Sequence, residues 1–245
     1  MAPPKLSPLS DGVRTAPRAL RERYDLPLLG GLIVAFVVTV LLWDFAFLYP
    51  LKIFVVLLHE LSHGMAALLT GGSIDRIELS PEQGGVCYTV GGARLVVLMA
   101  GYLGSMLWGG LLLLVASRTR FEKQFMVGLG VLLALVALLW ARGTFAFAFT
   151  LGAAATFIAL GVFAKRSLVA TVLKYFGLVS CLYAVLDIWD DAVSRNLEDS
   201  DATRFGDALG VGGSTFWGIV WIGLALLFAA WVLRQAVRRR AAQAR

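Results

Sequence analysis

The only two histidines of the chain lie in one short motif, His59-Glu60-Leu61-Ser62-His63. The residues on both sides of this motif are apolar, and the whole apolar run is long enough to form a helix. Residues four apart share one face of a helix, so His59 and His63 can direct their imidazole nitrogens at the same metal ion. Glu60 is close enough to accept a proton from a water at that metal. We therefore expect one zinc ion per chain, with His59 and His63 as ligands and Glu60 as general base.

A catalytic zinc needs a third protein ligand and one open position, and no histidine remains for this role. Among the carboxylates, Asp187 follows the longest apolar stretch and so lies deepest in an apolar run. We expect it to be the third ligand, because an isolated carboxylate at that depth would be costly. The alternatives are Asp190 and Asp191 on the same helix face, which could instead orient the ligands, and, less favoured, Asp44, Cys87 and Cys181.

The elements that must position this motif are apolar helices. Apolar residues make up 59% of the 245 residues, whereas charged residues make up only 16%. A membrane-spanning helix needs about 20 mostly apolar residues. Seven runs approach this length: Leu28–Leu48, Leu51–Thr70, Leu95–Ala116, Phe125–Ala141, Phe145–Ala164, Leu168–Ile188 and Thr215–Leu233. The sequence therefore predicts an all-α, multi-pass integral membrane protein with six to seven transmembrane helices.

Two polar segments interrupt this pattern. Residues 71–94 alternate around a Ser-Pro-Glu-Gln-Gly-Gly turn and predict a β-hairpin over Ser73–Val90, between the second and third helices. Residues 194–213 predict a short surface helix over Asp201–Leu209, capped by Ser200 or Asp199. We divide the chain into a flexible basic leader (residues 1–24), a single membrane-embedded domain (residues 25–237) and a basic tail (residues 238–245).

The net charge of +6 is concentrated near the two ends of the chain. Arginines on an apolar chain suit anionic lipid headgroups, and no aromatic or glycine-rich pattern accompanies them that would indicate nucleic-acid binding. We expect the lipid bilayer as a partner and no nucleic acid. The basic leader favours a cytoplasmic N-terminus. Seven crossings would place the arginine-rich tail on the other side, so either one run is not a full crossing or the charge bias is overridden.

The chain resembles the site-2 proteases, which are intramembrane zinc metallopeptidases. Members carry HExxH within a membrane helix, as at His59, Glu60 and His63, and a later membrane aspartate in a Leu-Asp-Gly context. Leu186-Asp187 matches two of these three positions, with Ile188 in the third. The stretch Ala100-Gly101-Tyr102-Leu103-Gly104-Ser105 is similar to a further family motif, Ala-Gly-Pro-Leu-Ala-Asn. Tyr102 stands for its proline and Ser105 for an asparagine that is thought to act at the site. The resemblance covers roughly residues 51–191.

The resemblance implies a zinc metalloendopeptidase that hydrolyses peptide bonds of membrane-associated protein or peptide substrates. Extended segments like the expected hairpin are thought to hold substrate in this family. The alternative is a zinc-binding membrane protein without hydrolysis, either a metal transporter or an inactive protease-like binder. A pure binding site does not need Glu60, and the fourth and fifth apolar runs hold almost no polar residues for a transport path.

Overall fold

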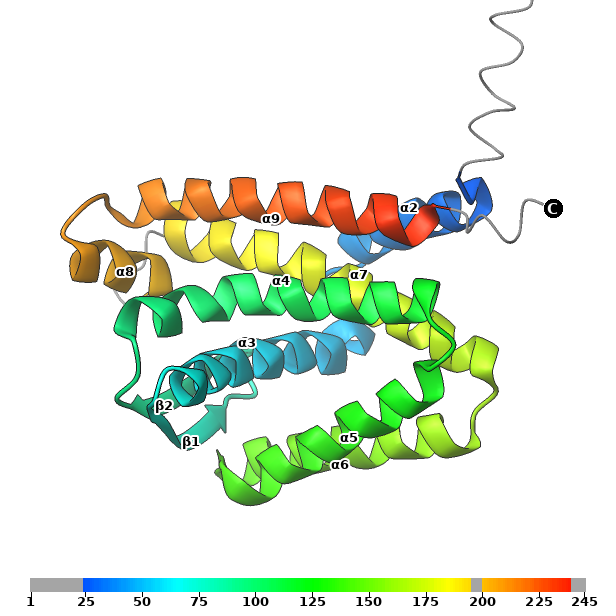
Figure 1. Cartoon of the computed structure of the whole chain (residues 1–245), viewed down its shortest axis with the longest axis horizontal. Helices are drawn as coiled ribbons and strands as arrows, with labels where there is room; N and C mark the ends of the chain where they lie inside the picture. Colours follow the sequence, from blue (N-terminus) through cyan, green and yellow to red (C-terminus); the bar gives the residue numbers. More distant parts are fainter. Residues whose placement is uncertain (1–23, 195–199, 239–245) are drawn as a thin grey trace, which may run out of the picture.

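The computed structural model describes residues 24–194 and 200–238. Within these residues the protein is a bundle of apolar helices with a small sheet at one end (Figure 1). The helices are α2 (Leu26–Leu41), α3 (Tyr49–Leu69), α4 (Arg94–Arg118), α5 (Glu122–Leu139), α6 (Thr144–Phe163), α7 (Arg166–Ile188), α8 (Asp201–Leu209) and α9 (Ser214–Val237). A 3-10 helix (Ala46–Leu48) precedes α3, and a π-helix (Trp189–Ser194) continues α7.

Six of these helical segments, those that contain α3, α4, α5, α6, α7 and α9, are long and apolar enough to cross a membrane. This confirms the expected all-α multi-pass architecture. The first predicted run, Leu28–Leu48, is not one continuous span. Asp25 caps helix α2 by accepting a hydrogen bond from the Leu28 N–H, and the helix has only 16 residues before the chain turns at Leu42. It is therefore shorter than the length needed to cross the hydrocarbon core alone.

Helix α3 is the central element of the bundle. Figure 1 shows it between the α5–α6 pair on one side and the layer of α4, α7 and α9 on the other. Apolar residues of α3 such as Ile53, Leu57 and Leu61 are almost fully buried. They share a core with α5 and α6, where Phe157 of α6 packs edge-on against Phe54 at 5.1 Å. The helix that bears the histidines is therefore held on several sides.

The predicted hairpin is present as β1 (Ser73–Leu79) and β2 (Gly85–Val90), paired antiparallel from Ser73↔Val90 to Leu79↔Gly85. A third short strand, β3 (Ala141–Arg142), pairs in parallel with β1, so the strand order is β2-β1-β3. Gly71, Gly91 and Gly92 have φ of 86°, 72° and 79°, which only glycine adopts readily, and they turn the chain at both ends of the hairpin. Strand β2 is left at the edge of the sheet.

The predicted surface helix is also present as α8, over Asp201–Leu209. Ser200 caps it by accepting a hydrogen bond from the Thr203 N–H at 3.2 Å, and Gly210 ends it with φ of 71°. It is an amphipathic surface helix, because Ala202 and Phe205 are buried against α4 and α9 while Arg204 and Asp207 are exposed. The alternative cap Asp199, the leader up to residue 23 and the tail from residue 239 lie outside the described residues.

Candidate metal centre

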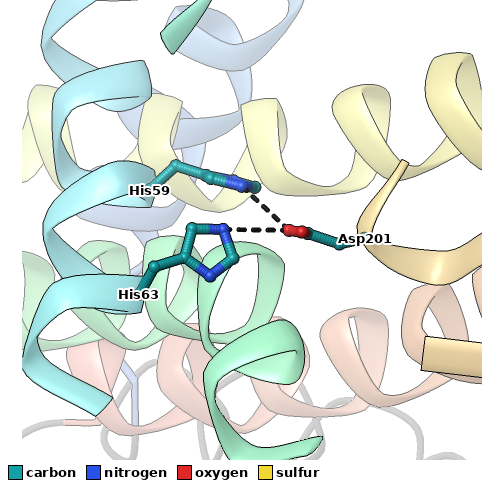
Figure 2. A group of neighbouring side chains, drawn as sticks. All are labelled: His59, His63 and Asp201. Carbon is teal, nitrogen blue, oxygen red and sulfur yellow. Dashed lines mark hydrogen bonds and ion pairs between the residues drawn. The ribbon is translucent and has the colours of Figure 1, made fainter. Parts of the chain in front are cut away.

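The two histidines of α3 project together into the space between α3, α4, α7 and α8. Their ring centroids are 4.9 Å apart, and their side chains are only 13% and 10% exposed. The Nε2 atom of His59 lies 3.2 Å from Asp201 Oδ2, and the Nε2 atom of His63 lies 3.0 Å from the same oxygen. Figure 2 shows both rings directed at this one carboxylate. Each of the three residues thus directs one ligand atom to the same place, and these three atoms lie within 4.8 Å of one another.

The opposite ring nitrogens also face acceptor oxygens: that of His63 is hydrogen-bonded, and that of His59 lies near a carboxylate. Nδ1 of His63 lies 2.7 Å from the Val97 carbonyl oxygen of α4, and a carbonyl can only accept, so this nitrogen carries the proton. Nδ1 of His59 faces Asp187 Oδ2 at 3.6 Å. Metal-ligating histidines characteristically present one nitrogen to the metal and the other to a carbonyl or carboxylate. The donor set therefore fits a zinc ion bound through the two Nε2 atoms and Asp201.

Asp201 is the first residue of α8, next to the Ser200 cap. Burial opposes ionisation of this carboxyl, but in the metal-free site the imidazoles of His63 and His59, when protonated, outweigh it and lower the pKa of Asp201 well below its usual value. The N-terminal end of a helix also favours a carboxylate. The side chain is therefore an anion, which is the form that ligates a metal.

Glu60 is buried on the side of α3 that faces the hairpin. A Cβ built on Gly85 of β2 would lie 2.7 Å from Glu60 Cγ, so a glycine is needed for the strand to pass this close. The Cys87 backbone N–H is directed at the Glu60 carboxylate. Glu60 therefore stands between the histidine pair and the edge of β2.

A cavity of about 850 Å³ surrounds these groups. Strand β2 lines one side of it, and Trp43 and Tyr183 line another, with their rings 5.7 Å apart. This volume is within the usual range of ligand pockets. The site thus combines a metal-competent cluster, a buried carboxylate and space for a substrate segment.

The structure brings the predicted residues His59, Glu60 and His63 together, but it places the expected third ligand differently. In the described part of the chain, Asp201 takes the position facing both Nε2 atoms, whereas Asp187 lies on the Nδ1 side of His59. Asp190 and Asp191 line the same cavity, and Asp191 accepts a hydrogen bond from the Tyr102 hydroxyl at 3.0 Å. The role of Asp187 as a zinc ligand stays a prediction.

The weaker candidates lie apart from the meeting point of the two Nε2 atoms. Asp44 is exposed in the turn after α2. Cys181 is buried in α7, with its thiol 3.8 Å from the Met106 carbonyl oxygen. Burial, and to a lesser extent the charge of Glu60, raises the pKa of Cys87 to about 12, so this thiol is neutral in the metal-free protein, and it does not belong to the group of ligand atoms that converge with the histidines. Ser105, in the place of the family asparagine, donates within α4 to the Gly101 carbonyl at 3.0 Å.

Sequence reasoning missed Asp201 because it ranked carboxylates by their depth in the apolar runs. A second signal was available in the sequence. The helix Asp201–Leu209 carries Ala202, Phe205 and Gly206 on one face, which is the pattern of a helix that packs on the bundle. A carboxylate in the first turn of such a docked helix can reach the interior from outside the membrane spans.

Gly101 of α4 leaves the space in which a metal would sit. A Cβ built on this residue would clash with His59 Nε2, His63 Nε2 and Asp201 Oδ2 together. We therefore expect Gly101→Ala to abolish stoichiometric zinc binding while the purified protein remains helical. Gly128→Ala on α5 is the matched control, since its Cβ would meet nothing within 4 Å. Full zinc occupancy in Gly101→Ala would show that the metal does not bind at this point.

The fold and the site together define a class: multi-pass membrane proteins whose central helix carries a paired-histidine metal motif. Residues 32–232, which contain every residue of this site, match the family model described as Peptidase M50B-like. The match spans most of the chain, and the protein belongs to this family, in agreement with the resemblance to site-2 proteases. No curated protein and no solved structure matches the chain.

Proposed function

We propose that the protein is an intramembrane zinc metalloprotease that hydrolyses peptide bonds of membrane-associated substrates. The observation that carries this proposal is the convergence of His59 Nε2, His63 Nε2 and Asp201 Oδ2 beside the buried Glu60. Membership of a peptidase family supports the same chemistry. We assign the metal ligands as His59, His63 and Asp201, and the catalytic base as Glu60.

Zinc held by these three residues would supply a Lewis acid that acidifies a water. Glu60, whose carboxylate lies next to the site, would accept the proton of the attacking water and deliver it to the leaving nitrogen. Val97 and Asp187 would keep the two imidazoles in the tautomer that leaves Nε2 free.

Zinc content is the direct test of this proposal. We expect about one zinc per chain in the purified protein, and a strong loss in His63→Ala because one of three protein ligands is removed. Cleavage of a membrane-embedded peptide should be lost in parallel. Zinc binding with no cleavage of any membrane substrate would favour a zinc-binding protein without hydrolysis. Absence of zinc from the native protein would contradict both this alternative and the proposed protease.

The outer edge of β2, where the Cys87 N–H is directed at Glu60, is the part of the site best placed to bind the substrate backbone. The Ile77 N–H donates to Trp140 on the β3 side, so its partner Cys87 points its own N–H away from β1. Alternate residues of a strand point the same way, so Gly85 and Thr89 present their backbone groups on this edge too. All three line the cavity. An unwound substrate segment can therefore add to β2 as a further strand.

Thr89→Pro tests this role of the edge, because it removes an outward backbone donor without changing a bond to β1. We expect cleavage to fall at least tenfold while zinc content stays at the native level. Thr89→Ala retains the N–H and should cleave at close to the native rate. Equal cleavage rates for the proline and alanine variants would show that the hairpin only connects two helices and does not bind the substrate.

A further inference from the structure

Helix α3 buries a lysine within an apolar segment that is long enough to cross a membrane. Lys52 lies in the segment Ala46–Leu69 and is only 7% exposed. A charged side chain at membrane depth is costly, and residues of this kind usually face the interior of the bundle and mark a functional site. Neither the metal centre nor the proposed hydrolysis uses this lysine. Its charge therefore needs a partner that the metal chemistry does not provide.

The Lys52 ammonium lies over the ring of Trp43, with Nζ 4.6 Å from the ring centroid. This cation–π contact attracts the charge, but the ring offers no acceptor oxygen to the three N–H donors. Within residues 24–194 and 200–238, the ammonium makes no hydrogen bond and no ion pair. Asp44 is the acid whose charge acts on it, yet Asp44 is exposed and makes no ion pair with it. The ammonium is thus buried with its hydrogen-bonding capacity unused.

The surroundings of Lys52 lie deep inside the bundle. Trp43 and Tyr175 of α7 belong to one apolar cluster. Tyr175 follows Arg166, the first residue of α7, by nine residues, which is about 13 Å along the helix. This is near the middle of a hydrocarbon core of about 30 Å, where lipid headgroups are out of reach. Other polar groups at this depth pair with each other, as the hydroxyls of Thr39 and Tyr175 do at 3.0 Å.

Lys52 shares a helix face with the metal ligands of α3. It precedes Val56, His59 and His63 by four, seven and eleven residues, which is the spacing of one side of a helix. Val56 and both histidines line the cavity. Seven residues of helix span about 10 Å, so Lys52 lies about 10 Å along α3 from His59. An extended chain covers this distance in about three residues.

Trp43 and the turn of the hairpin form the end of the cavity at the level of Lys52, which we call the Trp43 end. Trp43 and residues 82–84 of the turn line the cavity. Tyr49, one helical turn before Lys52, donates from its hydroxyl to the Pro81 carbonyl at 2.9 Å and holds the turn against this part of α3. A substrate segment that follows the outer edge of β2 from the metal centre to the turn therefore reaches the Trp43 ring, on which the ammonium rests.

The rest of the cavity disfavours anions. Its described lining holds six carboxylates and one arginine: Glu60, Glu82, Asp187, Asp190, Asp191, Asp201 and Arg204. Five of these carboxylates come from α3, α7, α8 and the π-helix, toward the metal centre. Glu82 belongs to the turn, but it is exposed and accepts a hydrogen bond from the Ser80 hydroxyl. An acidic substrate side chain is therefore repelled along most of the cavity and attracted only near Lys52, and specificity commonly combines attraction at one position with repulsion at others.

We propose that Lys52 selects substrates that carry an acidic side chain about three residues from the scissile bond, on the side toward the hairpin turn. The flexible lysine side chain leaves the Trp43 face and donates to the substrate carboxylate. Charge-assisted hydrogen bonds of this kind are stronger than neutral ones, and more so at a site removed from water. The inference rests on the proposed protease function and on the addition of substrate to β2.

Peptide binding to the zinc-loaded Glu60→Gln protein tests the selectivity without hydrolysis. Apolar membrane peptides, amidated at the C-terminus, carry one Glu or the matched Gln at successive positions. We expect one Glu position to strengthen binding at least tenfold over Gln, Lys52→Met in the same background to remove this preference, and Lys52→Arg to retain most of it. Lys174→Met is the matched control, because Lys174 also lies in a span but does not line the cavity or contact Trp43. It should keep the preference.

Two results of the binding experiment would overturn the proposal. One is the absence of any Glu position that binds better than Gln. The other is an equal weakening of Glu and Gln peptides by Lys52→Met, which would show that the lysine only supports the fold around Trp43. Zinc content and helicity are measured for each variant, so that a misfolded protein is recognised.

Cleavage by the native protein locates the acid relative to the scissile bond. The preferred Glu peptide should have a KM at least tenfold lower than its Gln counterpart, a similar kcat, and a cut about three residues from the Glu. Cleavage of both peptides with equal KM would refute the role of Lys52 and leave the protease function intact. Glu-selective binding without any cleavage would refute the protease function alone.

Discussion

Glu60→Gln is expected to retain zinc at the native stoichiometry and to lose at least about 100-fold in kcat. The amide is nearly the same size as the carboxylate, so the close passage of Gly85 and the packing of α3 are preserved. It cannot accept a proton, however, and general acid–base catalysis contributes roughly 10²–10⁴-fold to enzymatic rates. Glu60 does not belong to the group of ligand atoms that converge with the histidines, so the metal should remain.

The measurement combines metal analysis with single-turnover cleavage of a membrane-embedded peptide in detergent or vesicles. Glu78→Gln is a matched control, because Glu78 lies on β1 and pairs with Arg76 at 2.7 Å outside the cavity. It should cleave at close to the native rate. A Glu60→Gln protein that cleaves normally would show that the base is another residue, and one that lacks zinc would show that Glu60 helps to hold the metal.

The parts of this protein that its sequence predicts are those governed by local patterns. Apolar run length predicts the six long helices, because a span must bury its backbone and present apolar side chains. Alternation of Val86, Tyr88 and Val90 after a Ser-Pro-Glu-Gln-Gly-Gly turn predicts the hairpin, because both are local signals of paired strands. The spacing of His59 and His63 predicts their shared face, since it depends only on helix geometry. Each of these predictions is confirmed in the structure.

The features that sequence reasoning did not predict depend on packing between distant segments. The first apolar run looks like a full span, but the helix stops at Leu41 and the turn after it brings Trp43 beside Tyr183 of α7. Irregular backbone among the spans is tolerated where it lines a cavity, as Trp43 does. Likewise, no local pattern shows that Asp201 of α8 meets α3, 142 positions away in the sequence.

The choice between Asp201 and Asp187 as third ligand predicts different zinc affinities for two single variants. Asp201 Oδ2 lies near both Nε2 atoms, so Asp201→Ala removes a direct ligand and should weaken zinc binding more than about 100-fold. Asp187 lies 3.6 Å from the opposite nitrogen of His59. Loss of such an orienting partner typically costs 10–100-fold, so Asp187→Asn should weaken zinc binding about 10-fold.

The comparison needs a control for damage to α8, because a carboxylate in the first turn also stabilises a helix. Ser200→Ala removes the N-terminal cap of the same helix without removing a ligand, and should lower zinc affinity much less than Asp201→Ala does. Affinities are measured by competition with a chelator at neutral pH. A larger loss in Asp187→Asn than in Asp201→Ala would make Asp187 the ligand, as the sequence predicts, and Asp201 the orienting group. A larger loss of zinc affinity in Asp201→Ala than in Asp187→Asn would instead mean that a helix outside the membrane spans completes the metal site. Zinc binding and the docking of α8 would then depend on each other.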